Sequence, residues 1–160
     1  MECETCEFIK NNGLKLIEDE HIVAYMSPRP MAKGHMIVVP KNHYPIFENI
    51  PDELVAHIFS VVNKLSTIAF ETLGCQGTNI LINNGLSAGQ IDAHFQVNII
   101  PRKENDGLNL EWQPKKQSED EFAKILDNIL NPMKTSKKEP DVMEETDEEN
   151  YLMKSLRRIP

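Results

Sequence analysis

The segment from Gly89 to Arg102 carries chemically useful side chains at the spacing of a β-strand. From His94 onward polar and apolar residues alternate, a pattern typical of a strand with one buried and one accessible face. The side chains predicted to pack inward are those of Phe95, Val97 and Ile99. One imidazole and two carboxamides would then stand about 6 to 7 Å apart on the accessible face, from His94, Gln96 and Asn98.

A loop rich in glycine and amide side chains comes directly before this strand. It contains Asn83-Asn84-Gly85 and Gly89-Gln90. The backbone N–H groups of such loops can bind an anion. A polar strand face beside this loop predicts a phosphate-binding site.

A pair of cysteines near the N-terminus indicates a second kind of chemistry. Cys3 and Cys6 have the Cys-x-x-Cys spacing, which lets two thiolates approach one zinc ion. Buried thiols that bind no metal are the alternative interpretation, and a thioredoxin-like redox pair is disfavoured because that motif belongs to a strand-to-helix junction. The other two zinc ligands would come from elsewhere in a chain that has five histidines.

Two segments resemble the hallmark sequences of the histidine triad, or HIT, family of nucleotide hydrolases and transferases. The first runs from Gly34 to His43, and the second joins Asn-x-Gly, Ala-Gly-Gln and the polar row that ends at Pro101-Arg102. The resembling parts extend from about residue 3 to about residue 103. The resemblance implies a HIT-like fold, usually assembled as a homodimer whose sheet continues across the two subunits.

The chemistry of that family depends on three alternating histidines, of which the middle one attacks the α-phosphorus of a nucleotide. This chain has Gln96 at the middle position and Asn98 at the third. The nitrogen lone pair of a carboxamide is delocalised into the carbonyl group, so Gln96 can hydrogen-bond a phosphate but is neither a useful nucleophile nor a base. We therefore expect a pseudoenzyme that binds a nucleotide or a similar phosphate ligand.

The resemblance also assigns roles to individual residues. The phosphate contacts that it implies are Asn83, Gly89, Gln90, Gln96 and Asn98. Zinc-carrying members use two cysteines and two histidines, and these positions correspond to Cys3, Cys6, His43 and His94. An acidic residue that commonly holds the ribose hydroxyls is replaced here by Ser27, which weakens the expected ribose contact.

The remaining patterns predict the elements that position these groups. Pro51 and two acids begin a helix that Gly74 ends. Its apolar face is predicted to cover a sheet with Leu54, Ile58, Val61, Val62, Leu65, Ile68 and Ala69. Strands are predicted at residues 14–18, 21–27, 34–40 and 79–83, in addition to the one that begins at His94. Together these predicted elements indicate an α+β fold with about five mostly antiparallel strands and one long helix.

A helical C-terminal extension is predicted to follow the HIT-like domain, which we place at residues 1–113. Ser118 and Glu121 have the spacing of a capping box, which predicts a helix within residues 114–133 that Pro132 stops. Residues 134–160 are predicted to form a linker and a helix with acidic residues first and basic residues last.

Composition limits the partners and the compartment. A net charge of −8 argues against nonspecific binding to nucleic acid or to an anionic membrane, because both would repel the chain. Neither an 18-residue apolar run nor a signal-peptide pattern is present. The three cysteines suit reduced thiols better than a disulfide framework. We therefore expect a cytoplasmic protein.

Two further functions are consistent with the sequence. In the first, Gln96 positions water in an active hydrolase of phosphoramidates or dinucleoside polyphosphates, since phosphoryl transfer depends largely on positioning and charge stabilisation. In the second, the chain is a zinc-stabilised protein-interaction module that uses its C-terminal extension for recognition.

Overall fold

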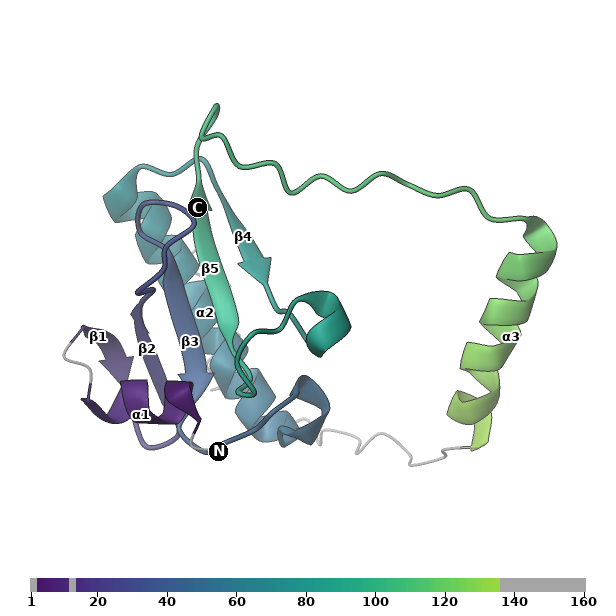
Figure 1. Ribbon diagram of the computed structural model, residues 1–160, viewed down its shortest axis with the longest axis horizontal. Coiled ribbons are helices and arrows are strands. Elements are labelled where there is room, and N and C mark those ends of the chain that lie inside the picture. Colours follow the sequence, from purple (N-terminus) through teal and green to yellow (C-terminus); the bar gives the residue numbers. More distant parts are fainter. Residues whose placement is uncertain (1–2, 12–13, 136–160) are drawn as a thin grey trace, which may run out of the picture. The chain divides into compact units, whose positions relative to one another are not determined.

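Five strands form one antiparallel sheet at the centre of the first of two compact units (Figure 1). The computed structural model describes residues 3–11 and 14–135; the first unit spans Met1–Asn109 and the second Leu110–Pro160. In pairing order the strands are β1 (Lys15–Glu18), β2 (Ile22–Met26), β3 (Met36–Pro40), β5 (Val97–Arg102) and β4 (Gly77–Leu81). Every neighbouring pair is antiparallel. The predicted α+β class is confirmed.

The central strands β2 and β3 are covered on both faces, which explains why the segment from Met36 to Pro40 is apolar throughout. One face packs against α2 (Asp52–Leu73) through Ile22, Ala24, Met36 and Val38. The opposite face carries α1 (Glu4–Asn11) and is formed by Val23, Tyr25, Ile37 and Val39. Because successive strand residues point to opposite faces, a strand between two helices needs no polar positions.

The long helix α2 matches the prediction for residues 51–74 closely. Pro51 precedes its first turn, and Gly74 ends it in the left-handed conformation with φ of 57°. The buried stripe consists of Ile58, Val61, Val62, Leu65 and Ala69. Ile68 was predicted to cover the sheet, but 38% of it is exposed because it lies at the edge of that stripe. By length and composition α2 could cross a membrane, a test that the core helix of a globular domain also passes.

Three elements of the first unit differ from the sequence predictions. Strand β5 begins at Val97 and not at His94, because its pairing with β3 extends only to Val97 opposite Val38. Strand β4 ends at Leu81, two residues before the predicted end, because its pairing with β5 runs from Gly77 opposite Arg102 to Leu81 opposite Asn98. Helix α1 was not predicted at all. A helix of eight residues is too short to be stable by itself, so tertiary contacts determine it.

The second unit contains α3 (Glu119–Thr135). The predicted capping box is confirmed, since the Ser118 and Glu121 side chains bond each other and the backbone N–H groups of both residues. Pro132 does not stop the helix as predicted; it lies inside it. Proline removes its own N–H donor and crowds the carbonyl group four residues earlier, but the residues after it can still bond and continue the helix. The helix predicted after residue 140 lies outside the described residues.

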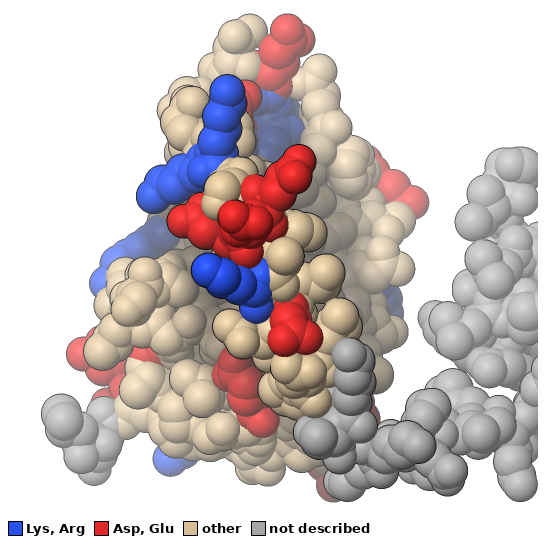
Figure 2. Space-filling view, turned by 90° about the vertical axis from the view of Figure 1, so that its right-hand side faces the viewer, with Lys and Arg blue, Asp and Glu red and all other residues tan. Residues whose placement is uncertain are grey.

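Charged side chains of both signs are mixed on the surface of the molecule. Figure 2 shows lysine and arginine beside aspartate and glutamate on the face that it views. Among the described residues, Arg102 and Asp106 form an ion pair at 2.6 Å. The described part of this face therefore offers a polyanion no extended basic patch.

Candidate functional site

Four potential metal ligands from three separate segments meet in one cluster. Cys3 and Cys6 lie at the start of α1, His43 follows β3, and His94 precedes β5. One ligand atom from each lies within 4.8 Å of all the others. The Cys6 Sγ atom is 3.3 Å from His94 Nδ1 and 3.5 Å from His43 Nδ1, and Cys3 Sγ is 3.6 Å from His94 Nδ1.

These distances fit a tetrahedral zinc ion. With Zn–S near 2.3 Å and Zn–N near 2.0 to 2.1 Å, tetrahedral geometry places sulfur and nitrogen ligands roughly 3.5 Å apart. His94 is fully buried, and its Nε2–H donates to the carbonyl oxygen of Pro40 at 2.9 Å. This bond leaves the Nδ1 lone pair facing the thiols, which is how a second hydrogen bond usually orients a metal-binding histidine.

The protonation states of the cluster also suit a metal. Burial lowers the pKa of His94, which favours the neutral imidazole that a metal requires. Burial and the neighbouring Cys3 raise the pKa of the Cys6 thiol. Without an ion, two adjacent thiolates repel each other, so the protonated thiol is favoured. A divalent cation would favour the thiolates instead.

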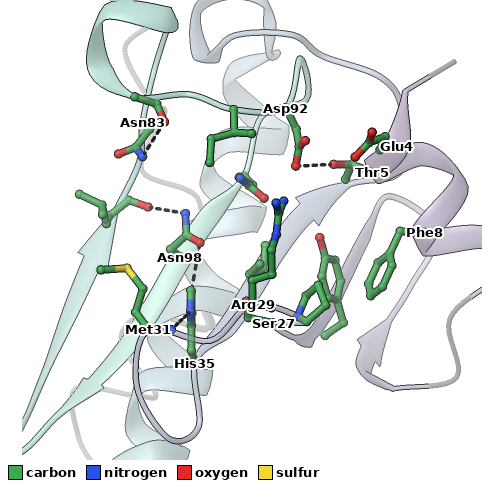
Figure 3. Close-up of a pocket in the computed structure, with 17 residues that line it drawn as sticks. Glu4, Thr5, Phe8, Ser27, Arg29, Met31, His35, Asn83, Asp92 and Asn98 are labelled. Carbon is green, nitrogen blue, oxygen red and sulfur yellow. Dashed lines mark hydrogen bonds between the residues drawn. The ribbon is translucent and has the colours of Figure 1, made fainter. Parts of the chain in front are cut away.

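A second site is a pocket of about 520 Å³ on the face of the sheet that carries α1 (Figure 3). Its floor is a row of directly paired residues across four strands: Tyr25, Ile37, Asn98 and Leu81. Helix α1, the loop between β2 and β3 and the loop between β4 and β5 contribute the walls. The volume lies within the range of small-molecule sites.

The loop between β4 and β5 is held in shape by the side chain of Gln90. Its Oε1 accepts from the Gly85 N–H at 2.7 Å, and its Nε2 donates to the carbonyl oxygens of Pro45 and Asp92. The loop turns at Gly85 and Gly89, where φ is 88° and 83° and a side chain would be strained. The Asn83 amide donates to the Gly89 carbonyl oxygen at 3.2 Å.

The structure places four of the five residues predicted to contact phosphate on the pocket lining: Asn83, Gly89, Gln96 and Asn98. Gln90 is not among the lining residues, because its amide is directed into its own loop. The predicted polar row is only partly formed. Gln96 and Asn98 face the pocket, whereas His94 belongs to the cysteine cluster. The inward residues Phe95, Val97 and Ile99 are buried as predicted.

Two side chains of the pocket lining, His35 and Asn98, bond each other. His35 Nε2 lies 3.0 Å from Asn98 Oδ1, and its Nδ1 accepts from the Met31 N–H at 3.1 Å. Burial lowers the pKa of His35, so the neutral ring with its proton on Nε2 fits both contacts. The Asn98 amide nitrogen donates to the Leu81 carbonyl oxygen at 3.3 Å. The hydrogen-bonding groups of both side chains thus have partners within the protein.

Several lining residues were not recognised from the sequence. They are Thr5 and Phe8 of α1, Tyr25 of β2, Arg29 after β2, and Asp92 before β5. The rings of Phe8 and Tyr25 lie 4.9 Å apart, and Thr5 Oγ1 contacts Asp92 at 3.5 Å. Burial, together with the charge of Asp92 and Cys3, raises the pKa of Tyr25 to about 12. No local pattern marks these residues, because separate segments bring them together.

Comparison with known proteins agrees with this architecture. The HIT domain family matches residues 10–105. Adenylylsulfatase HINT3 of Arabidopsis thaliana is 38% identical over 109 residues, which cover 67% of this chain and 55% of that protein. This chain therefore spans little more than half the length of that relative.

Two further proteins are similar over most of their length. Adenosine 5′-monophosphoramidase HNT1 of Candida albicans is 31% identical over 134 residues, covering 79% of this chain and 88% of that protein. The crystal structure of a Zn-bound histidine triad family protein from Mycobacterium smegmatis has a TM-score of 0.64 and 28% identity. The match covers 84% of this chain and 97% of the Mycobacterium smegmatis chain.

Proposed function

This chain belongs to the HIT family, and we propose that it binds a nucleoside phosphate or a similar phosphate ligand without carrying out nucleotidyl transfer. The observation that carries the proposal is the pocket beside the glycine-containing loop, with Gln96 on its lining. Two similar proteins are named for activities on adenosine 5′-phosphate derivatives, an adenylylsulfatase and an adenosine 5′-monophosphoramidase. They support a ligand of that class here.

The absence of transfer follows from the side chains that line the pocket. Gln96 has a carboxamide in place of a nucleophilic imidazole. His35 supplies the one imidazole of the described lining, and both of its nitrogens already have partners. The Tyr25 hydroxyl, with a pKa of about 12, is a weak nucleophile near neutral pH. A covalent nucleotidyl-imidazole therefore has no acceptor in the described lining.

The predicted phosphate contacts divide into two groups. Gln96 makes no hydrogen bond within the described part of the chain, so its amide is available to a ligand. We propose that Gln96 and Asn83 meet the ligand directly, Asn83 through the amide oxygen and the second N–H that its bond to Gly89 leaves free among the described residues. Gly89, Gln90 and Asn98 would instead hold the loop and the strand in place, because their polar groups are bonded within the protein.

We also propose that the cluster of Cys3, Cys6, His43 and His94 holds zinc. Four protein ligands complete a tetrahedron and leave no open position, which is typical of structural zinc. The ion would link the start of α1 to the sheet and take no part in chemistry at the pocket. Reduced thiols of this kind suit the cytoplasm, where we expect the protein to reside.

A homodimer is expected from the family resemblance. Of the two edge strands, β1 carries Lys15 and Glu18, whereas β4 carries no charged residue and exposes 41% of Ile80. Uncharged strand edges favour pairing with another strand. We therefore place the dimer contact at β4.

The second candidate is an active hydrolase in which Gln96 positions water. The names of the two relatives favour it. The described lining offers the Glu4 and Asp92 carboxylates as bases but no imidazole with an unbonded nitrogen, which opposes it. Turnover of adenosine phosphoramidate that Gln96→Ala abolishes would establish this candidate.

The proposed function is tested by titration calorimetry of the zinc-loaded protein with AMP. We expect saturable binding that Gln96→Ala weakens. Preparations are first freed of nucleotide that co-purifies. No heat at millimolar AMP or GMP would refute the nucleotide-binding proposal.

A further inference from the structure

The loop between β2 and β3 places one cationic side chain in the pocket. Among the described residues that line it, Arg29 carries the single positive charge, and Glu4 and Asp92 carry negative charges. Figure 3 shows the Arg29 side chain pointing from its loop into the cavity. An anionic ligand would therefore meet repulsion from two carboxylates and attraction from one guanidinium.

The backbone that carries Arg29 is held firmly. Pro28 and Pro30 flank it, and each proline fixes its own φ. The Arg29 N–H donates to the Ser27 hydroxyl oxygen at 3.3 Å, and the Ser27 N–H donates to the His35 carbonyl oxygen at 2.9 Å. The turn is therefore preorganised, which reduces the entropy lost when a ligand binds.

The guanidinium group of Arg29 is available to a ligand. It forms no ion pair with any residue that the structure describes. Arg102 is different, since it is held by Asp106 and by the Asn79 side chain. A guanidinium offers five N–H donors in a planar fork that fits two phosphate oxygens.

The amides across the pocket cannot replace this charge. Asn98 has both ends of its amide bonded within the protein, and the Asn83 amide nitrogen is bonded to Gly89. Gln96 remains, and it is neutral. A phosphate group placed among these residues would have little compensation for its lost hydration.

We propose that Arg29 is the anion-binding residue of this pocket and that it selects ligands with a phosphate group, such as nucleoside monophosphates, over uncharged nucleosides. The inference rests on the proposed nucleotide-binding function and adds the residue that provides the charge. We infer that Ser27 contributes to this selectivity, because a carboxylate at position 27 would pair with the Arg29 guanidinium and compete with the ligand. With serine there, Arg29 is free for the ligand.

The test compares AMP with adenosine by titration calorimetry in the wild type and in three variants. Arg29→Gln removes the charge, Ser27→Asp adds a competing carboxylate, and Lys33→Gln removes an exposed cation of the same loop that does not line the pocket. Charge-assisted hydrogen bonds of this kind correspond to about a ten- to hundredfold change in affinity.

We expect the wild type and Lys33→Gln to prefer AMP over adenosine by at least about tenfold, and Arg29→Gln and Ser27→Asp to lose most of that preference. The AMP affinity of the wild type should also fall with added salt, and that of Arg29→Gln should change little. Tight AMP binding that is equal in the wild type and Arg29→Gln would overturn the role of Arg29 and leave the proposed function standing. No binding of either compound to the folded wild type would overturn both.

Discussion

Removal of the metal site should release α1 and open one wall of the pocket. The perturbation is Cys6→Ser, which deletes one thiolate that lies 3.3 Å from His94 Nδ1 and 3.5 Å from His43 Nδ1. Thr5 and Phe8 of the same helix line the pocket. Loss of zinc should therefore reach the ligand site through α1, although the ion itself binds no ligand there.

The magnitude follows from the size of the helix. Fixing the backbone of eight residues costs about 8 to 16 kcal/mol. Burial of Ile9 and the ring contact between Phe8 and Tyr25 contribute about 2 to 5 kcal/mol, and the helical hydrogen bonds add about 4 kcal/mol. The remaining deficit is at most about 10 kcal/mol, which a structural zinc site of about that strength can supply.

The assay is hydrogen exchange measured by mass spectrometry, with zinc counted by native mass spectrometry. Amides of residues 4–11 should exchange rapidly in Cys6→Ser and in chelator-treated wild type, while those of β3 and β5 remain protected. The matched control is Cys75→Ser, because Cys75 is buried in the core away from the cluster. Undiminished protection of α1 in a protein shown to lack zinc would refute the reasoning.

Three other predictions concern separate parts of the structure. The pKa of His35 in the folded protein lies below its unfolded value near 6.5, so the unfolded chain binds more protons as the pH falls below about 7. The free energy of unfolding should therefore decrease between about pH 7 and pH 5, and less steeply in His35→Asn; an equal pH dependence in the two proteins would contradict this. In an ultraviolet titration, the absorbance change of one tyrosine should occur near pH 12 and should be absent in Tyr25→Phe. Ionisation of Tyr25 near pH 10 would exclude its burial beside Asp92. If the protein forms the proposed homodimer, Ile80→Lys at the β4 edge should convert it to a monomer in sedimentation velocity, and a dimer that persists in this variant would refute the contact at β4.

The elements that the sequence predicts well are those set by local patterns. Helix α2 has its own start signal, stop signal and periodicity, and β3 is an uninterrupted apolar run. The cysteines and histidines of the metal cluster were predictable because few such residues exist in the chain and the family resemblance selects among them.

The pocket was harder to predict because its walls come from distant segments. Helix α1 is too short to be recognised by periodicity, and it contributes Thr5 and Phe8. The inward direction of the Gln90 amide depends on Pro45, which lies 45 positions away. The local sequence predicts only that Arg29 is an exposed residue between two prolines, and the fold places it beside a cavity.

Mass spectrometry of the zinc-loaded protein after incubation with adenosine phosphoramidate can distinguish nucleotide binding from covalent nucleotidylation. Spectra recorded under native and denaturing conditions are compared. We expect a complex with the intact ligand under native conditions that disappears completely on denaturation. An adenylyl group that stays attached after denaturation, or no complex at millimolar ligand, would contradict it.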